Sequence, residues 1–187
     1  MLTPQKRVDI LVFGDALEAL ALRGVLEAWG ILVRCHFIGN VQQAVTLLSG
    51  QEALAEIIIL SCHGDEDGLI LPELYSALEK EMPYHKRLTP QNFQEFLSLQ
   101  NNVVIATGCF LGREDFARVF LEKGASAYIG SDGEPEGTSF LYFMLSFFYC
   151  YLHKEMPIQE AFMIAKTQGE MSNRICLYEE LPKTFST

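Results

Sequence analysis

The sequence is poor in basic residues and has no apolar run long enough to cross a membrane. Lys and Arg number 14 against 24 Asp and Glu, which gives a formal net charge of -10. Binding to a nucleic-acid backbone requires clustered basic side chains, so this balance argues against nucleic acid as a partner. The most apolar stretch, Phe140–Leu152, is shorter than the roughly 20 residues that span a bilayer, and it is typical of a buried helix. We therefore expect neither nucleic acid nor membrane as a partner.

Paired cysteines and cofactor motifs are also missing. The five cysteines are scattered singly without a C-x-x-C spacing, which indicates free thiols in a reducing compartment. Cys62 and His63 are adjacent, so on a strand they would point to opposite faces and would not share a metal. No G-x-G-x-x-G follows the first apolar run, and that run contains Asp9 and is too short for a signal peptide. We expect a cytoplasmic protein without metal or cofactor.

Apolar runs alternate with stretches of helical periodicity along the whole chain. The apolar runs predict strands over residues 8–13, 31–38, 55–62, 101–109, 125–130 and 173–180. The helical stretches predict helices over residues 15–30, 40–50, 89–100, 113–124, 137–152 and 157–168. A longer connection, residues 67–90, carries one or two short elements.

This alternation predicts an α/β fold, a three-layer sandwich with a mostly parallel central sheet of about six strands and helices on both faces. No linker or composition shift divides the chain, so residues 1–187 are expected to form a single domain. In such sheets, ligands and chemistry collect beyond the carboxyl ends of the strands.

A histidine and a cysteine follow two consecutive core strands at matching positions. The third strand ends in "IIILSCHG" with His63, and the fourth ends in "VVIATGCFLG" with Cys109. Alone, a buried cysteine or a histidine at the end of a strand is more often structural than catalytic. If these strands are neighbours, however, both side chains lie at one sheet edge, where a thiol can act as nucleophile and an imidazole as general acid.

The glycines beside these residues suit the same chemistry. An oxyanion hole needs backbone N–H groups close to the reacting carbonyl, and Gly64 and the amide of Cys109 are the candidate donors. Gly108 would permit a sharp turn that presents the sulfur.

These motifs resemble the caspase-like cysteine peptidases, in particular the branches that contain gingipains, clostripain, separase and CHAT domains. In that family one hydrophobic strand delivers a His-Gly pair and a later one delivers the catalytic Cys. The stretches "DGLILPE", "LTPQNFQEFL", "LEKGASAYIGSDG" and "MPIQEAFMIAKTQ" are similar as well, so the resemblance covers roughly residues 55–167.

The resemblance implies a cysteine endopeptidase of caspase-like fold with flavodoxin-like strand order and a peptide or protein as substrate. His63 would be the general acid and base, Cys109 the nucleophile and Gly64 an oxyanion contributor. A regulatory protein partner is also implied, because CHAT domains are often joined to repeats that regulate them. The oligomeric state is not indicated.

Members of these branches often cleave after basic residues with an acidic side chain in the pocket. In the loop "GSDGEPEG", Asp132 is the preferred candidate, ahead of Glu134 and Glu136, although a solvated Asp-Gly turn explains the loop equally well. The acids of "GDEDG" after His63 would line the cleft, bind a cation or keep the loop solvated.

Two other functions fit parts of the sequence. The opening strand, acid and helix resemble a receiver domain, but the third strand ends in "SCHG" without the Asp that a receiver phosphorylates. A catalytically silent caspase-like or receiver-like interaction module therefore stays open as the alternative. The nucleophile elbow of other hydrolases fails on spacing, because it needs G-x-C-x-G or G-x-S-x-G and the chain has "GCFLG".

Overall fold

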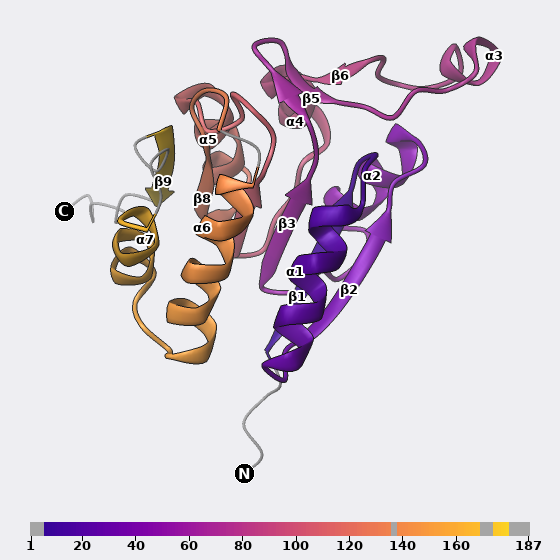
Figure 1. Cartoon of the computed structure of the whole chain (residues 1–187). Coiled ribbons are helices and arrows are strands. Elements are labelled where there is room, and N and C mark those ends of the chain that lie inside the picture. The colour runs from indigo at the N-terminus through magenta and orange to yellow at the C-terminus, as the bar shows by residue number, and fades with distance from the viewer. Residues whose placement is uncertain (1–5, 136–137, 169–173, 180–187) are drawn as a thin grey trace.

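The structure, a computed structural model, describes residues 6–135, 138–168 and 174–179 (Figure 1). Its main sheet consists of β1 (Arg7–Val12), β2 (Leu32–Phe37), β3 (Ile57–Ser61), β7 (Asn102–Ala106), β8 (Ala125–Ser131) and β9 (Ile175–Glu179). The strand order is β2-β1-β3-β7-β8-β9, and every pair is parallel except β8 with β9. The predicted mostly parallel six-stranded sheet and its flavodoxin-like order are confirmed.

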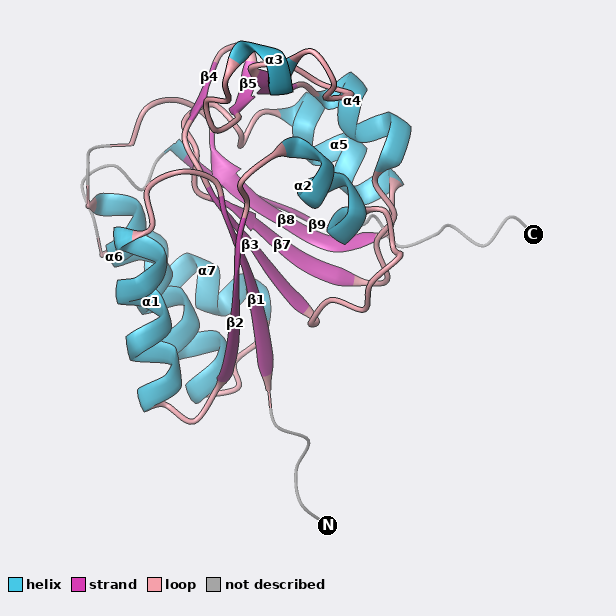
Figure 2. Ribbon diagram, turned by 90° about the vertical axis from the view of Figure 1, so that its right-hand side faces the viewer, coloured by secondary structure: helices cyan, strands magenta, loops and turns pink. Residues whose placement is uncertain are grey.

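Helices cover both faces of this sheet, as the sequence predicts (Figure 2). One layer is formed by α1 (Leu17–Ala28), α6 (Ser139–Phe148), the π-helical turn η1 (Tyr149–His153) and α7 (Ile158–Lys166). The other layer is formed by α2 (Val41–Leu48), α4 (Pro90–Phe96) and α5 (Glu114–Glu122). The α/β three-layer sandwich is therefore confirmed.

The α4 helix shows how the sequence sets a boundary. Thr89 is the N-cap, its hydroxyl accepts from the Asn92 amide, and the Asn92 side chain accepts from the Thr89 amide. Pro90 occupies the first helical position, where no N–H is needed.

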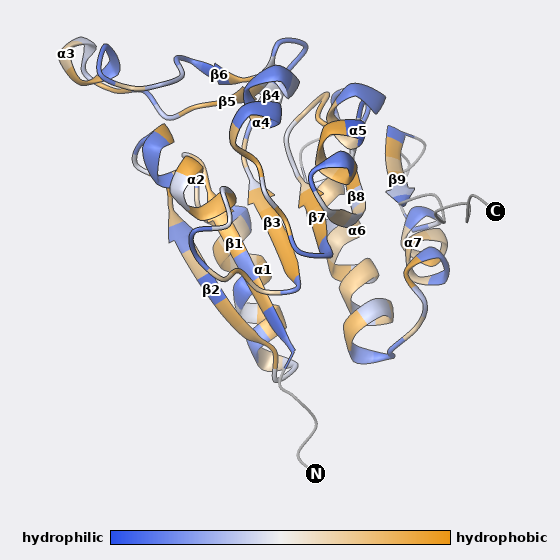
Figure 3. Cartoon of the chain, turned by 180° about the vertical axis from the view of Figure 1, so that it is seen from behind, coloured by the Kyte–Doolittle hydropathy of each residue, from blue (hydrophilic) through white to orange (hydrophobic). Residues whose placement is uncertain are grey.

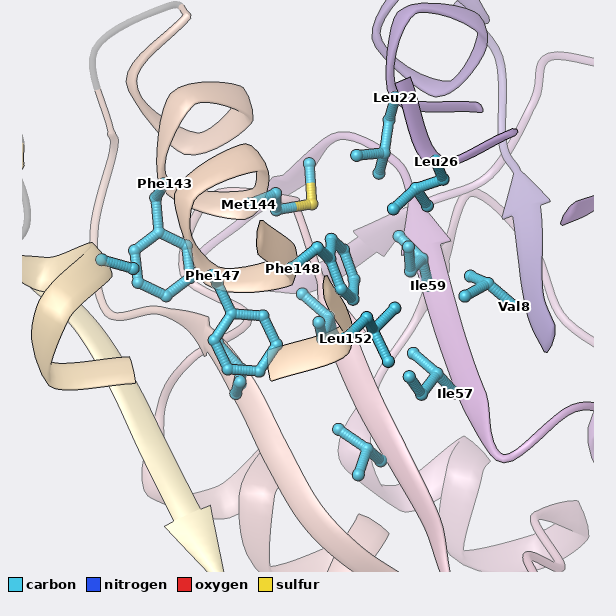
Figure 4. Close-up of a cluster of buried hydrophobic side chains, with 14 of the residues drawn as sticks. Val8, Leu22, Leu26, Ile57, Ile59, Phe143, Met144, Phe147, Phe148 and Leu152 are labelled. Atoms are coloured by element: carbon cyan, nitrogen blue, oxygen red, sulfur yellow. The ribbon is translucent and has the colours of Figure 1, made fainter. Parts of the chain in front are cut away.

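Apolar side chains fill the two layers between sheet and helices. The central strands β3 and β7 are hydrophobic over most of their length and are buried on both faces (Figure 3). On the α1–α6 side, Phe148 of α6 lies close to Ile59 of β3, and Phe147 stacks on Phe143 of the same helix (Figure 4). The apolar stretch that the composition singles out is thus a buried helix. No helix of the described residues has the length and hydrophobicity needed to cross a bilayer.

A second, small sheet lies beyond the carboxyl ends of the main strands (Figure 1). It contains β4 (Gly64–Asp65), β5 (Gly68–Ile70) and β6 (Arg87–Leu88), paired antiparallel, with the short helix α3 (Ser76–Glu79) between β5 and β6. The sequence suggested only one or two short elements here, because strands of two or three residues leave no readable periodicity. This sheet starts directly after His63.

Candidate active site

The third strand places His63 at the carboxyl edge of the main sheet. β3 ends at Ser61, and the exposed His63 lies two residues further on. Its carbonyl oxygen accepts a hydrogen bond from the Ile70 amide at 3.0 Å, so the chain turns here into the β4–β5 hairpin. The hairpin thus holds the backbone of His63 while the side chain stays open to solvent.

Cys109 lies on a tight turn after β7. The turn follows Ala106, and its Phe110 has φ 59°, in the left-handed region that few residues other than glycine adopt. The Phe110 amide donates to the Gly133 carbonyl at 3.0 Å, which holds this conformation. We expected Gly108 to make the sharp turn, but its φ is not left-handed. The left-handed residue is instead Phe110, which follows Cys109 and is bonded to Gly133.

The two strand ends touch through their glycines. β3 and β7 are paired in register, with Leu60 opposite Ala106, so the loops that follow emerge side by side. A Cβ on Gly64 would collide with the Cys109 carbonyl oxygen, and one on Gly108 would lie 2.9 Å from the Gly64 nitrogen. Both positions need glycine because the two backbones approach this closely.

His63 and Cys109 line one pocket of about 390 Å³. The other residues that line it are Phe13, Asp15, Glu18, Ser61, Cys62, Thr107, Pro135, Thr138 and Phe140. Most of them come from the ends of β1, β3 and β7 and from the starts of α1 and α6, at the edge where parallel sheets bind ligands. The structure thus brings the two predicted residues, His63 and Cys109, to the same cavity.

Two backbone N–H groups of this region, those of Gly64 and Cys109, are not used by the secondary structure. The Ile70 amide donates to the His63 carbonyl, so Gly64 and Leu69 face each other as a pair without mutual hydrogen bonds. The Gly64 N–H therefore donates no hydrogen bond to β5. Within the described residues, the Cys109 N–H has no backbone acceptor either.

The two cysteines of the pocket differ in burial. Burial raises the pKa of the Cys62 thiol to about 12, with the nearby Cys109 adding to the shift. The Cys62 sulfur packs on the α5 side of the sheet, against the second core layer. Cys109 is half-buried, and its pKa is raised less, by burial and then by the charge of Glu134. Of the two thiols, Cys109 has the smaller pKa shift, so it is the better candidate for a nucleophile.

Two acids of the pocket were not identified as site residues from the sequence. Asp15 follows β1, and Glu18 lies in the first turn of α1. Burial raises the pKa of Glu18, the charge of His63 lowers it, and the charge of Asp15 raises it again. The sequence does point to these two acids, because "FGDALE" directly follows the first strand. Binding sites in parallel sheets form beyond the carboxyl ends of the strands, and this applies to the first strand as well.

Of the acids chosen from the sequence, Asp132 and Glu134 do not line the pocket. Asp132 is exposed, its amide donates to the Arg174 carbonyl at 2.8 Å, and it does not line the pocket with His63 and Cys109. Glu134 is close enough to act on the Cys109 thiol, whereas Glu136 lies outside the described residues.

The acids of "GDEDG" do not line the pocket either. Asp65 accepts two hydrogen bonds at 2.8 Å from Nε of Arg87, and this partner lowers the pKa of Asp65. Among residues 6–135, 138–168 and 174–179, no group of three or more His, Cys, Asp or Glu side chains is arranged to hold a metal ion.

Three solved structures share this architecture at very low sequence identity. Separase, from the Saccharomyces cerevisiae separase–securin complex, matches 94% of this chain with TM-score 0.60 and 9% identity. The Arg-specific cysteine proteinase gingipain R matches 93% of it with TM-score 0.58 and 10% identity. drICE matches 96% with TM-score 0.54 and 8% identity.

These proteins differ greatly in length. The match covers 12% of the separase chain, 46% of the gingipain R chain and 89% of the drICE chain. No family model and no curated protein matches the sequence. At this identity the likeness concerns the fold, and the chain has the caspase-like fold of these cysteine peptidases.

Proposed function

We propose that the protein is a cysteine endopeptidase in which Cys109 is the nucleophile and His63 the general acid and base. The observation that carries the proposal is the shared pocket, because the imidazole and the sulfur come from neighbouring strand ends and line the same cavity. The caspase-like fold, which is found in cysteine peptidases, supports it.

The proposed reaction follows the usual course of acyl transfer to a thiol. The Cys109 sulfur forms a bond to the peptide carbonyl carbon as its proton passes to the His63 imidazole. His63 then protonates the leaving nitrogen as the C–N bond breaks, which leaves a thioester. Water attacks the thioester, gives up a proton through His63, and the C–S bond breaks to restore the thiol and release the acid.

The developing oxyanion would bind to the amides of Gly64 and Cys109. The backbone of Gly64 lies against that of Cys109, and neither N–H group donates to the backbone of the hairpin or the turn. Preorganised donors of this kind stabilise a transition state more than a ground state, since they meet charge that appears only during reaction. The carbonyl to be cleaved would accordingly lie over the contact between Gly64 and Gly108.

Cleavage after basic residues is the specificity that the pocket favours. Asp15 and Glu18 face the same cavity as the sulfur, so a Lys or Arg side chain of the substrate would find two carboxylates there. A cationic ligand would also lower the raised pKa of Glu18. Asp132, the acid suggested by the sequence, is the competing candidate for this role.

We also propose that residues 1–187 act as one domain. Strands from near both ends of the chain, β1 and β9, belong to the same sheet, which supports this proposal.

The first experiment compares Cys109→Ala with Cys176→Ala. Peptide-library cleavage measured by mass spectrometry should fall by at least about 10³-fold in Cys109→Ala and stay unchanged in Cys176→Ala, because only the first removes the attacking atom. In parallel, iodoacetamide labelling of the wild type should modify Cys109 much faster than Cys62. Cleavage that survives the loss of Cys109 would rule out the proposal.

A catalytically silent interaction module is the second candidate, and the raised pKa of Cys109 favours it. A neutral thiol next to a negatively charged side chain is a weaker nucleophile than the thiols of many cysteine enzymes, whose pKa is lowered. The labelling experiment separates the two: slow modification of Cys109 at pH 8, together with no cleavage of any library peptide, supports the silent module.

A further inference from the structure

The hairpin that follows His63 and the helix that follows Cys109 are joined by one arginine. Arg113 is the N-cap residue of α5, four residues after Cys109. Its Nη1 donates a hydrogen bond of 2.6 Å to the backbone carbonyl of Glu66, at the turn between β4 and β5. Glu66 lies three residues after His63. One side chain thus spans from the sulfur side of the site to the imidazole side.

The guanidinium is itself held in place on α5. Nε and Nη2 donate to the two carboxylate oxygens of Asp115, at 3.3 and 3.2 Å. Its Cζ lies 5.7 Å from the centre of the buried Phe116 ring, over the ring face. The Arg113 side chain is 29% exposed, so it is partly shielded from water. The planar guanidinium group is held by Asp115 and by the Phe116 ring, so it makes a more rigid connection than a lysine side chain would.

The hairpin tip is shaped so that the Glu66 carbonyl is presented to this arginine. The amides of Asp67 and Gly68 donate to the Asp65 side chain, at 3.0 and 3.2 Å. Asp65 is paired in turn with Arg87 of β6. These bonds fix the turn around Glu66, but they connect it only to the small sheet. Arg113 supplies the link to the Cys109 side.

Two contacts join the hairpin to the Cys109 side of the site. The first is the close approach of Gly64 to Cys109 and Gly108, next to His63. The second is the bond from Arg113 to the Glu66 carbonyl at the exposed tip of the hairpin. Leu69 of β5 anchors the base of the hairpin in the core, so the bond from Arg113 restrains the tip. Because Ile70 binds the His63 carbonyl, the hairpin and the imidazole would move together.

We propose that Arg113 is a positioning residue that sets the distance from the His63 imidazole to the Cys109 sulfur by tying the hairpin to α5. This inference rests on the proposed function for its consequence in catalysis. Its structural part, the restraint of residues 64–70, does not depend on any activity. Small displacements of a catalytic group cost much of the rate, while substrate affinity depends on other contacts.

Arg113→Ala and Arg118→Ala form a matched pair on the same helix. Arg118 is exposed, so its removal changes the net charge equally and leaves the hairpin untouched. With a peptide that the wild type cleaves, Arg113→Ala should lower kcat by about tenfold with KM within about twofold of the wild type. Arg113→Lys should recover part of kcat, since it keeps the charge but cannot bind Glu66 and Asp115 together. Iodoacetamide labelling of Cys109 should be unchanged, because the turn that carries the sulfur stays intact.

Hydrogen exchange tests the restraint without any turnover. Peptides that cover residues 64–70 should exchange faster in Arg113→Ala than in Arg118→Ala, while peptides from β3 and β7 exchange alike in both. Equal exchange in the two variants, or equal kcat, would overturn the proposal. Cleavage by the wild type that does not require Cys109 would instead overturn the proposed function, and the exchange result would still decide the role of Arg113.

Discussion

The structure contains two histidines near carboxylates, and their surroundings are opposite. In β1, Asp9 is fully buried, and it accepts hydrogen bonds from Nε and Nη2 of Arg34, both at 2.6 Å, from Nε2 of His36 at 2.9 Å and from the Ala55 amide at 2.5 Å. In the pocket, Glu18 lies near His63 without any such set of partners.

The pKa values express this difference. Burial alone would raise the pKa of Asp9, but the bonds from His36, Arg34 and Ala55 hold it well below its ordinary value. Burial raises the pKa of Glu18, and the nearby His63 only reduces that shift. A carboxylate held by several protein partners stabilises the fold, whereas one that lines a cavity without such partners is available to a ligand. A histidine next to an acid therefore does not by itself mark a site.

Asp9→Asn should have the largest effect on stability and none on the chemistry of Cys109. The amide cannot accept all four hydrogen bonds, and its NH₂ group faces donors. We expect the free energy of unfolding to fall by about 3 kcal/mol, at the low end for a broken buried ion pair because Arg34 can reach water. Urea denaturation measures it, with Asp67→Asn, whose side chain is 81% exposed, as the control.

The effect of Asp9→Asn on the free energy of unfolding should depend on pH. Because folding lowers the pKa of Asp9, its contribution to stability is present above the pKa of an unfolded aspartate, about 3.9, and disappears as the pH falls below it. The wild type should lose its advantage over Asp9→Asn in acid. An advantage that is the same at pH 3 and pH 7 would contradict the assigned role of this carboxylate.

Neutralising the pocket acids should change substrate choice instead of stability. In the Asp15→Asn, Glu18→Gln double variant, kcat/KM for peptides cleaved after Arg should fall by about 10- to 100-fold relative to peptides with a neutral residue there, since charge-assisted hydrogen bonds are lost. The unfolding midpoint should stay within a few degrees of the wild type. Asp132→Asn is the informative comparison, because a loss of preference in that variant alone would support the acid suggested by the sequence.

The smallest expected effect is on the Cys109 thiol. Glu134→Gln removes the charge that, after burial, raises the pKa of Cys109. Iodoacetamide labelling at pH 7.5 should become about two- to threefold faster, and the pH profile of the rate should move to lower pH. Cys62 should stay unreactive in both proteins, because burial keeps its pKa at about 12. An unchanged profile would mean that Glu134 does not act on the sulfur.

Much of the arrangement follows from sequence patterns that have a physical cause. The central parallel strands β3 and β7 are buried and leave long apolar runs that can be recognised in the sequence, and the rule of carboxyl ends predicts that His63 and Cys109 share one edge. The small sheet cannot be recognised in the sequence, because its strands are too short to show an alternation of apolar and polar residues. The left-handed Phe110 was hidden too, since its conformation is imposed by a partner, Gly133, that is distant in sequence.

The direct backbone contact between Gly64 and Gly108 also limits which substitutions this protein can accept during evolution. Neither position can acquire even a methyl group unless the opposite loop gives way, so the two loops must vary as a unit. The requirement comes from backbone proximity and not from reactivity. A descendant that exchanged its sulfur for an inert side chain would still need both glycines to close the sheet edge. The architecture therefore requires the glycine pair, whereas the proposed chemistry depends on the side chains of His63 and Cys109.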